Sequence, residues 1–415
     1  MSDHRAADHH DLDDENWIGP AIPSLLREMN ERLVMDVIRE TSSVSRAEVS
    51  RRTGLSKPTV SLAFRTLEAS GLVARIGLES GRPGRSGVLY RQVADAALAV
   101  AVEITVSGVR AELVDLEGHG LATNEREFVA RHASEIFDAV AQCITDVLRT
   151  AGRRRDEVEA VTVGTPGVIN PGTGRLDQAG TLPELDGSNP GIELSNRLGY
   201  PVTVLNDVEL AALGEQADGA GRDVSDFAVV WVGAGLGSAL VLGGQLHRGH
   251  RGAAGEVFDI PFRRAIAVET GSDGNGPRID ASAAGIVELA DAARTKHPAS
   301  MLLPPFDART VLDAAATDDS LGVEVRDRLA QWIAWYAAAI AAIADPELIV
   351  LAGPIGSHDT LLAPVAAELA ALLTEPPHIA SSKLGDRAVL AGAISEGRRD
   401  AAERSFVDRV LTREN

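Results

Sequence analysis

Polar side chains stand where a buried strand should end in the middle of the chain. Asn206 and Asp207 close the apolar run PVTVLND at 201–207. In open α/β sheets, side chains at the carboxyl ends of strands gather around a common ligand site. A carboxylate fixed there can accept a proton or a hydrogen bond from a hydroxyl group, so Asp207 is a candidate for binding a hydroxylated ligand. A strand-end Asx turn without a ligand is the alternative interpretation.

A glycine-rich turn lies between the next two apolar runs. The sequence Gly233-Ala-Gly-Leu-Gly237 separates FAVVWVG at 227–233 from SALVLGG at 238–244. Glycines such as Gly235 have no Cβ atom, so their backbone N–H groups can approach an anion or a sugar closely. A tight hairpin with no ligand would have the same sequence.

These residues need an α/β framework to position them. From about Ala97 onward, β-branched runs alternate with alanine-rich amphipathic stretches, which is typical of α/β layering. Seven runs are predicted as strands: 98–105, 109–116, 160–166, 201–207, 227–233, 238–244 and 347–353. A strand pair with a turn occurs at 98–116 and again at 227–244. The repetition predicts a duplicated fold of two lobes with a cleft between them.

The N-terminal part has the pattern of a helix-turn-helix. Ser45 and Glu48 have the spacing of a capping box, and Gly54 supplies a tight turn. Ser56 caps a second helix that Gly71 ends. An amphipathic helix over about 24–41 would complete the core, and strands at 72–76 and 88–92 would flank the loop Gly81–Gly87 as a wing.

The second helix of this motif is the candidate for reading DNA. Val60, Phe64 and Leu67 lie at helical spacing and should face inward, which leaves short polar and basic side chains outside. The wing arginines sit on a Gly/Pro backbone, which is typical of arms that enter narrow A·T-rich minor grooves. The predicted DNA contacts are Ser45, Arg46, Ser56, Lys57, Thr59, Ser61, Arg65, Arg82 and Arg85. A helix-turn-helix used only for protein contacts is the alternative.

Charge is distributed unevenly along the 415 residues. The net charge of −20 argues, taken globally, against a nucleic-acid-binding protein. Between Ser45 and Arg91, however, nine basic residues stand against three acidic ones. This module therefore has a charge of about +6, and the remainder of the chain has about −26. The partition reverses the first inference and favours DNA binding by the N-terminal module.

Composition narrows the protein class further. Cys143 is the one cysteine, which excludes a disulfide framework and a cysteine-rich zinc site and fits a cytoplasmic location. The longest nearly apolar run, 329–344, falls short of a bilayer span. Residues 1–20 are acidic and polar, and we expect them to be disordered despite the histidines at 4, 9 and 10.

Several separated motifs, in this order, carry a family resemblance. They are SRAEVSRRTGLSKPTVS from Ser45, VGTPGVINPGTGRL at 163–176, VLNDVELAALGE at 204–215, VGAGLGSALVLGGQLHRGHRGAAGEV at 232–257 and DPELIVLAGPIG at 345–356. With them the chain resembles the ROK family (repressors, open reading frames and kinases), specifically its sugar-responsive transcriptional repressors. The resemblance covers about residues 28–400 and implies a winged helix-turn-helix followed by an actin-like, ribonuclease-H-like α/β domain of two lobes.

The resemblance also implies site residues. Asp207 matches the catalytic base of the ROK sugar kinases, and Gly255-Glu256 resembles the sugar-contacting Ala-Gly-Glu of the family. Asp259 stands where the family has a histidine, and Asp280 where it has a glutamate. The expected effector-binding residues are Gly167, Asn206, Asp207, Gly235, Glu256, Asp259 and Asp280.

Two departures from the family pattern matter. ROK kinases have an Asp-x-Gly-Gly-Thr phosphate loop, whereas this chain has Glu103-Ile-Thr-Val-Ser107, so we expect no ATP and no catalysis. The cysteine-rich zinc loop is replaced by residues 262–280 without cysteine, so the zinc site should be lost and no metal or cofactor is expected.

The predicted organisation is a tail at 1–20, a winged helix-turn-helix at 21–93, a ROK domain for effector binding and oligomerisation at 97–400, and a C-terminal helix or tail at 401–415. The predicted function is repression of carbohydrate uptake or metabolism genes by a homodimer or homotetramer. It would bind an inverted-repeat, A/T-rich operator, and a sugar or sugar derivative in the cleft would modulate that binding. One alternative is a DNA-binding regulator of the ROK fold that has lost sugar sensing and responds to another metabolite or partner. A sugar kinase is the less favoured alternative.

Overall fold

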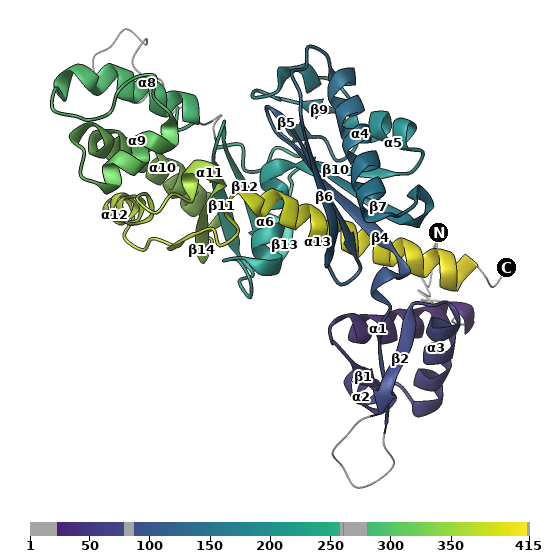
Figure 1. The fold of residues 1–415 in the computed structure, drawn as a ribbon. Helices are drawn as coiled ribbons and strands as arrows, with labels where there is room; N and C mark the ends of the chain where they lie inside the picture. Colours follow the sequence, from purple (N-terminus) through teal and green to yellow (C-terminus); the bar gives the residue numbers. More distant parts are fainter. Residues whose placement is uncertain (1–22, 79–86, 258–259, 261–279, 413–415) are drawn as a thin grey trace, which may run out of the picture. The chain divides into compact units, whose positions relative to one another are not determined.

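The computed structural model describes residues 23–78, 87–257, 260 and 280–412, which form two compact units. The first unit contains the chain up to Val93 together with the residues from Phe406 onward, and the second runs from Ala94 to Ser405 (Figure 1). The expected tail at 1–20, the wing residues Arg82 and Arg85, and Asp259 all lie outside the described residues.

The first unit is a winged helix-turn-helix. Its helices are α1 (Pro23–Arg39), α2 (Arg46–Thr53) and α3 (Lys57–Ala69). Its antiparallel sheet has the order β1-β3-β2, formed by Val44–Ser45, Val88–Gln92 and Val73–Leu78. The Ser45 hydroxyl accepts a hydrogen bond from the backbone N–H of Glu48 at 3.4 Å, and the Ser56 hydroxyl accepts one from the backbone N–H of Thr59 at 3.3 Å. Both predicted N-caps are therefore confirmed.

One detail of the predicted capping box differs. The Glu48 carboxylate pairs with the guanidinium of Arg51 at 2.6 Å, one turn further along α2. An i,i+3 ion pair on an exposed helix face competes with the return hydrogen bond to the cap. Gly54 does end α2, with a left-handed φ of 73°. Helix α3 ends two residues before the predicted Gly71.

The core of the first unit includes the predicted inner face of α3. Val60, Phe64 and Leu67 have no exposed surface, and the Tyr90 ring lies 4.5 Å from that of Phe64. Phe406 is also buried, with the guanidinium of Arg32 4.9 Å from the centre of its ring. The described residues after helix α13 (Ala388–Phe406) thus belong to the first unit, and residues 407–411 continue as a short helix.

The second unit contains two five-stranded sheets of the same design. The first has the order β10-β7-β4-β5-β6 and the second the order β13-β12-β11-β14-β15. In each, three antiparallel strands are extended by two parallel ones. The seven predicted strands are all present, and the duplicated two-lobed α/β fold is confirmed. The first-sheet strands are β4 (Leu98–Ile104), β5 (Gly108–Asp115), β6 (Gly120–Glu127), β7 (Val158–Thr165) and β10 (Val202–Asn206).

Helices cover these sheets and define one core for each lobe. Helices α4 (Ala133–Ala151) and α5 (Pro190–Leu198) pack on the first sheet. The second sheet consists of β11 (Phe227–Val232), β12 (Leu236–Leu242), β13 (Gln245–His247), β14 (Leu348–Ala352) and β15 (His378–Ser381). It is covered by α8 (Ala283–Ala293), α9 (Ala308–Ala316), α10 (Ser320–Ala344), α11 (Gly353–Gly356) and α12 (Leu362–Leu372). The short strands β8 (Val168–Ile169) and β9 (Leu176–Asp177) form a separate ribbon.

Two helices, α6 (Asp207–Asp218) and α13, lie between the two sheets and touch through glycines (Figure 1). A Cβ atom at Gly214 would lie 2.4 Å from the carbonyl oxygen of Ala388. A Cβ atom at Gly392 would lie 1.8 Å from the carbonyl oxygen of Leu210. Both distances are impossible for a real side chain, so glycine at each position allows the two backbones to meet.

No helix in the described part of the chain is both long enough and apolar enough to cross a membrane. The apolar run at 329–344 forms the C-terminal part of α10, whose buried side includes Trp332 and Ile333.

We predict that Gly392→Ala destabilises the second unit by about 2–3 kcal/mol, because overpacking at the helix crossing outweighs the gain of roughly 1 kcal/mol in helix propensity. Urea unfolding followed by tryptophan fluorescence measures this, since Trp231, Trp332 and Trp335 all lie in that unit. Gly397→Ala, also in α13, is the control, because its Cβ would find its nearest neighbour at 3.3 Å. Equal stability of the two variants would contradict the proposed role of the crossing.

Candidate functional site

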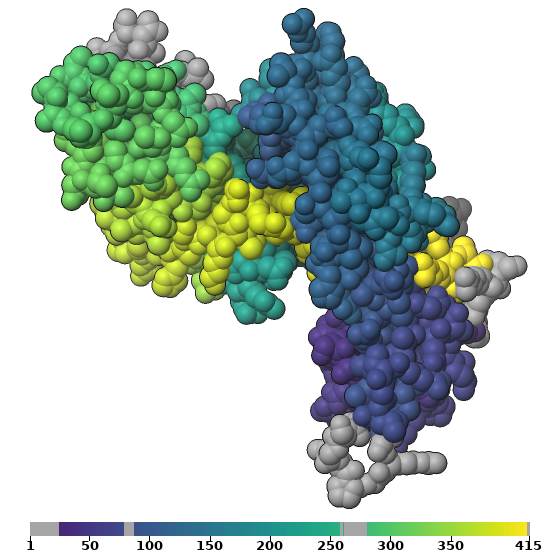
Figure 2. Space-filling view, in the orientation of Figure 1, coloured from purple at the N-terminus to yellow at the C-terminus, as the bar shows by residue number. Residues whose placement is uncertain are grey.

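A cavity of about 590 Å³ opens between the lobes of the second unit. Its wall includes strand ends of both sheets, and Figure 2 shows the hollow between the lobe drawn in blue and the lobe drawn in green. Six predicted effector residues line it: Gly167, Asn206, Asp207, Gly235, Glu256 and Asp280. The structure thus brings these residues together from distant parts of the sequence, and their contact with a ligand stays a prediction.

Asn206 and Asp207 stand at the junction of β10 and α6. The Asn206 side chain accepts the backbone N–H groups of Val208 and Glu209 at 2.8 and 3.1 Å and donates to the carbonyl of Gly167 at 3.0 Å. Asn206 is therefore the helix cap. The Asp207 carboxylate accepts the N–H of Val208 at 2.9 Å and lines the cavity, and its burial raises its pKa to about 6.

A partly buried ion pair supports this junction, and it was not predicted from the sequence. The Arg248 guanidinium lies 2.9 Å from the Glu209 carboxylate and also donates to the carbonyl of Ile169 at 3.3 Å. The other Glu209 oxygen accepts the backbone N–H of Asn206 at 3.2 Å. Glu209 and Arg248 are positioning residues, because they fix the strand end without lining the cavity.

Glycines let the second lobe come close to this junction. A Cβ at Gly237 would lie 2.9 Å from a methyl group of Val208, and one at Gly235 would lie 3.1 Å from Thr181. Gly255 has a φ of 93°, and the Ser238 hydroxyl donates to its carbonyl at 2.5 Å. This turn places the neighbouring Glu256 on the cavity wall.

Asp280 closes the wall from a third segment. Its carboxylate accepts the backbone N–H of Ser282 at 3.0 Å, just before α8 begins. Ser282 caps that helix by accepting the N–H of Gly285 at 3.3 Å. Asp280, which is shorter than the glutamate expected from the family, is thus held beside the N-cap of α8.

Three further charged residues line the cavity and were not predicted: Glu103, Arg110 and Asp386. Glu103 is the penultimate residue of the buried strand β4 and is 7% exposed. One of its carboxylate oxygens, Oε2, is buried without a hydrogen-bond partner. Burial raises its pKa to about 7 against the opposing effect of Arg110, and the nearby Asp207 raises it further. A lone acid within the apolar run LAVAVEI was the sequence signal for Glu103.

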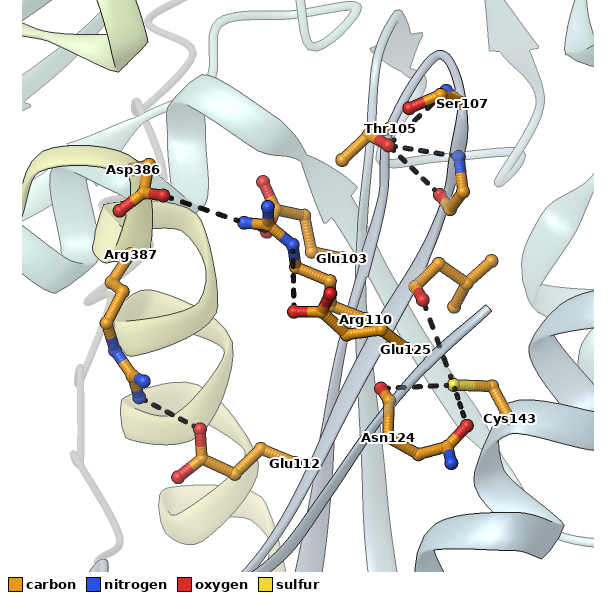
Figure 3. A network of polar contacts seen from close by, with 12 residues as sticks. Glu103, Thr105, Ser107, Arg110, Glu112, Asn124, Glu125, Cys143, Asp386 and Arg387 are labelled. Atoms are coloured by element: carbon orange, nitrogen blue, oxygen red, sulfur yellow. Dashed lines mark hydrogen bonds and ion pairs between the residues drawn. The ribbon is translucent and has the colours of Figure 1, made fainter. Parts of the chain in front are cut away.

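The turn after β4 is closed on itself. The Thr105 hydroxyl oxygen accepts the backbone N–H groups of Ser107 and Gly108 at 3.4 and 3.1 Å (Figure 3). The hydroxyl also donates to the carbonyl of Gly108 at 3.2 Å. The N–H groups of Ser107 and Gly108, which could bind a phosphate in a glycine-rich loop, are thus engaged within this turn.

Among the described residues, no group of three or more His, Cys, Asp or Glu side chains is arranged to hold a metal ion. Cys143 is buried, with its thiol 3.4 Å from the carbonyl of Asn124 (Figure 3).

The helix-turn-helix presents part of its predicted DNA surface openly. Ser56, Lys57 and Arg65 are exposed, and Thr59 and Ser61 are half-buried. Ser45 is 8% exposed and occupied as a helix cap. The Arg46 guanidinium lies over the rings of Phe64 and Tyr90, 5.5 and 5.0 Å from their centres. Ser45 and Arg46 therefore have structural roles within the domain. DNA contact stays a prediction for all of them.

The raised pKa of Glu103 predicts a pH-dependent stability. Between pH 4.5 and 7 the folded chain retains a proton that the unfolded chain has released, so the free energy of unfolding falls as pH rises. Glu103→Gln removes this pH-dependent loss. We expect the free energy of unfolding of the variant to be higher than that of the wild type by on the order of 3 kcal/mol at pH 8 and by little at pH 4. Urea unfolding at both pH values measures the difference.

Glu125→Gln is the control for that experiment, because the Glu125 side chain is 72% exposed and lies outside the cavity lining. A stability gain for Glu103→Gln that is the same at both pH values would contradict the assignment.

Comparison with known proteins identifies a related family for each of the two units. The ROK family profile matches residues 99–396, and a winged helix-turn-helix DNA-binding profile matches residues 30–74. The DNA-binding transcriptional dual regulator NagC of Escherichia coli is 24% identical over 82% of this chain and 84% of its own length. A putative xylose repressor of Caldicellulosiruptor is 26% identical over 56% of this chain, and the match spans 59% of that repressor.

A solved structure supports the same assignment of fold. The crystal structure of a ROK family transcriptional regulator, a homolog of the E. coli MLC protein, superposes with a TM-score of 0.75 at 20% identity. The match covers 93% of this chain and 99% of that one. The family profile spans most of the chain, and the cavity lies within the region it matches. This chain is a member of the ROK family with an N-terminal winged helix-turn-helix DNA-binding domain.

Proposed function

We propose that this protein is a transcriptional regulator, acting as a repressor of carbohydrate uptake or metabolism genes, whose operator binding responds to a sugar in the cavity. The observation that carries the proposal is the combination, in one chain, of a winged helix-turn-helix and a carboxylate-lined cavity between two ROK lobes. Carboxylates and closely approaching glycine backbones are groups that hydrogen-bond sugar hydroxyls. The names of the xylose repressor and NagC support the same class of function.

The DNA partner is an inverted-repeat, A/T-rich operator bound by a homodimer or a homotetramer. The basic surplus of the helix-turn-helix region supplies attraction to phosphate, while the acidic remainder repels DNA. Lys57, Thr59, Ser61 and Arg65 would enter the major groove. Two-fold symmetry of the protein would place the half-sites a whole number of helical turns apart.

The sugar acts by favouring one arrangement of the lobes over another. A ligand shifts such an equilibrium only if it binds the two states differently. Helix α13 provides a continuous connection, because it starts directly after the segment that holds the cavity residue Asp386 and ends at Phe406. Phe406 belongs to the unit that contains the helix-turn-helix.

A sugar kinase is the less favoured function. The turn at 105–108 engages the N–H groups of Ser107 and Gly108 in its own hydrogen bonds, and Glu103 replaces the aspartate of the kinase motif. The absence of cysteine from residues 262–280 supports a protein without the family's zinc. From the turn and from Glu103 we propose that the protein does not use ATP. An ATP-consumption assay over hexoses and amino sugars tests this, and turnover with any of them would contradict it.

We predict that Lys57→Ala and Arg65→Ala each weaken operator binding by about tenfold in a gel-shift or anisotropy titration. Each change removes a positive charge from an exposed position on the recognition helix. Arg154→Ala is the matched control, because Arg154 is exposed on the second unit and should leave DNA affinity unchanged. Unchanged affinity in both helix variants would overturn the assigned DNA surface.

We predict that Asp207→Asn reduces sugar binding at least tenfold and leaves operator binding intact. The substitution keeps the size of the side chain and removes the charged acceptor from the cavity wall. Thermal shift with a sugar panel, on the wild type and the variant, measures the loss. A sugar that stabilises both proteins equally would show that Asp207 is not part of its site.

A further inference from the structure

The charge of the cavity is strongly unbalanced. Its described lining contains five carboxylates and a single guanidinium, that of Arg110. The carboxylates are those of Glu103, Asp207, Glu256, Asp280 and Asp386. A ligand that enters this cavity therefore meets a surplus of negative charge, and the sign of the ligand's own charge affects how well it binds.

Arg110 is not available as a receptor for an anion. Its guanidinium lies 3.3 Å from the carboxylate of Glu125, 3.8 Å from that of Glu103 and 4.0 Å from that of Asp386 (Figure 3). Three carboxylates around one guanidinium more than neutralise its charge. A phosphate group next to Arg110 would have to displace these partners, and it would meet the other acids of the cavity.

The backbone near Arg110 offers an anion little compensation. In the turn from Thr105 to Gly108, the N–H groups of Ser107 and Gly108 are bonded to the Thr105 hydroxyl. An anion-binding nest needs such groups to point outward and to lack a partner. These two N–H groups are therefore not available to the phosphate of a phosphorylated sugar.

Glu103 points to the charge that this cavity does favour. The residue is more than nine-tenths buried and lines the cavity. Its Oε2 atom accepts no hydrogen bond from the described residues, and the Arg110 guanidinium lies 3.8 Å from it, beyond hydrogen-bond distance. A buried carboxylate oxygen without a hydrogen bond is costly, and a ligand that donates a charged hydrogen bond to the ionised Glu103 gains correspondingly. An ammonium group is such a donor.

We propose that the effector is an unphosphorylated amino sugar with a free ammonium group, that Glu103 is the residue that selects it, and that the acidic cavity excludes sugar phosphates. The inference rests on the proposed sugar-responsive function and specifies its ligand class. The hydroxyl groups of the ring would bind Asp207, Glu256 and Asp280, and the ammonium group would lie against Glu103.

Calorimetry on the full-length protein with matched ligands tests this proposal. The probes are glucose, mannose and galactose, the three corresponding 2-amino-2-deoxy sugars, and the 6-phosphates of the amino sugars. For the ring that fits, we expect the amino sugar to bind at least about tenfold more tightly than the parent hexose. Its 6-phosphate should bind at least about tenfold more weakly than the amino sugar.

Two variants isolate the residue responsible. Glu103→Gln should remove the preference for the amino sugar and retain binding of the parent hexose. Glu125→Gln is the matched control, because it removes another carboxylate beside Arg110 from a position outside the cavity lining, and it should retain the preference. If Glu103→Gln fails to fold, the wild type still decides: the preference should shrink in high salt and vanish when the amine is deprotonated.

The outcomes separate the ligand class from the function. Equal affinity for amino sugar and parent hexose, or tighter binding of a 6-phosphate, would overturn the proposed ligand class and leave the sugar-responsive function standing. Failure of every sugar to bind, with operator binding intact, would overturn both the ligand class and the sugar-responsive function.

Discussion

The close crossing of α6 and α13 is the constraint on which the rest of the second unit depends. Gly214 and Gly392 allow the two backbones to touch between the sheets. The N-terminus of α6 carries Asp207 into the cavity, and α13 follows directly from the segment that carries Asp386. An apolar cluster of Leu210, Ala211, Val389 and Ala393 surrounds the crossing, and the cavity residue Trp231 packs against it. A change at this point therefore alters the walls of the cavity and the course of α13 together.

Charge is the second organising feature. The helix-turn-helix region concentrates positive charge within a strongly acidic chain, so that attraction to DNA is confined to one module. Within the second unit, the cavity gathers carboxylates whose burial raises the pKa values of Glu103 and Asp207. Such groups are expensive to bury, and their concentration at one place is typical of a functional site.

The sequence was sufficient to predict much of this arrangement. The helix-turn-helix and its caps were predictable because Ser45, Gly54 and Ser56 act through local backbone geometry. The seven apolar strands were predictable because burial selects β-branched runs. Strand β6, with the sequence GLATNERE, escaped prediction because its surface is largely exposed and its composition is polar. Strand β15 also escaped prediction, because it has only four residues and forms by parallel pairing with strand β14.

The cavity was only partly predictable, because some of its residues lie in local sequence motifs and others are brought together only by the tertiary fold. Family motifs identified Asn206, Asp207 and Glu256, because each lies in a conspicuous local sequence. Arg110 and Asp386 have no such context, and they meet only because the fold joins segments 276 residues apart. The contact of Gly214 with Gly392 is likewise a property of the tertiary fold.

In the proposed function, occupancy of the cavity and binding of operator DNA are coupled. The most direct test uses the sugar that stabilises the protein in the thermal-shift panel. Calorimetry measures the affinity of the protein for this sugar in the absence and in the presence of saturating operator. Thermodynamic linkage requires that DNA weaken sugar binding by the same factor by which sugar weakens DNA binding. We predict a reciprocal loss of about fivefold or more, within the range usual for coupled sites. An unchanged sugar affinity with bound operator would contradict the account.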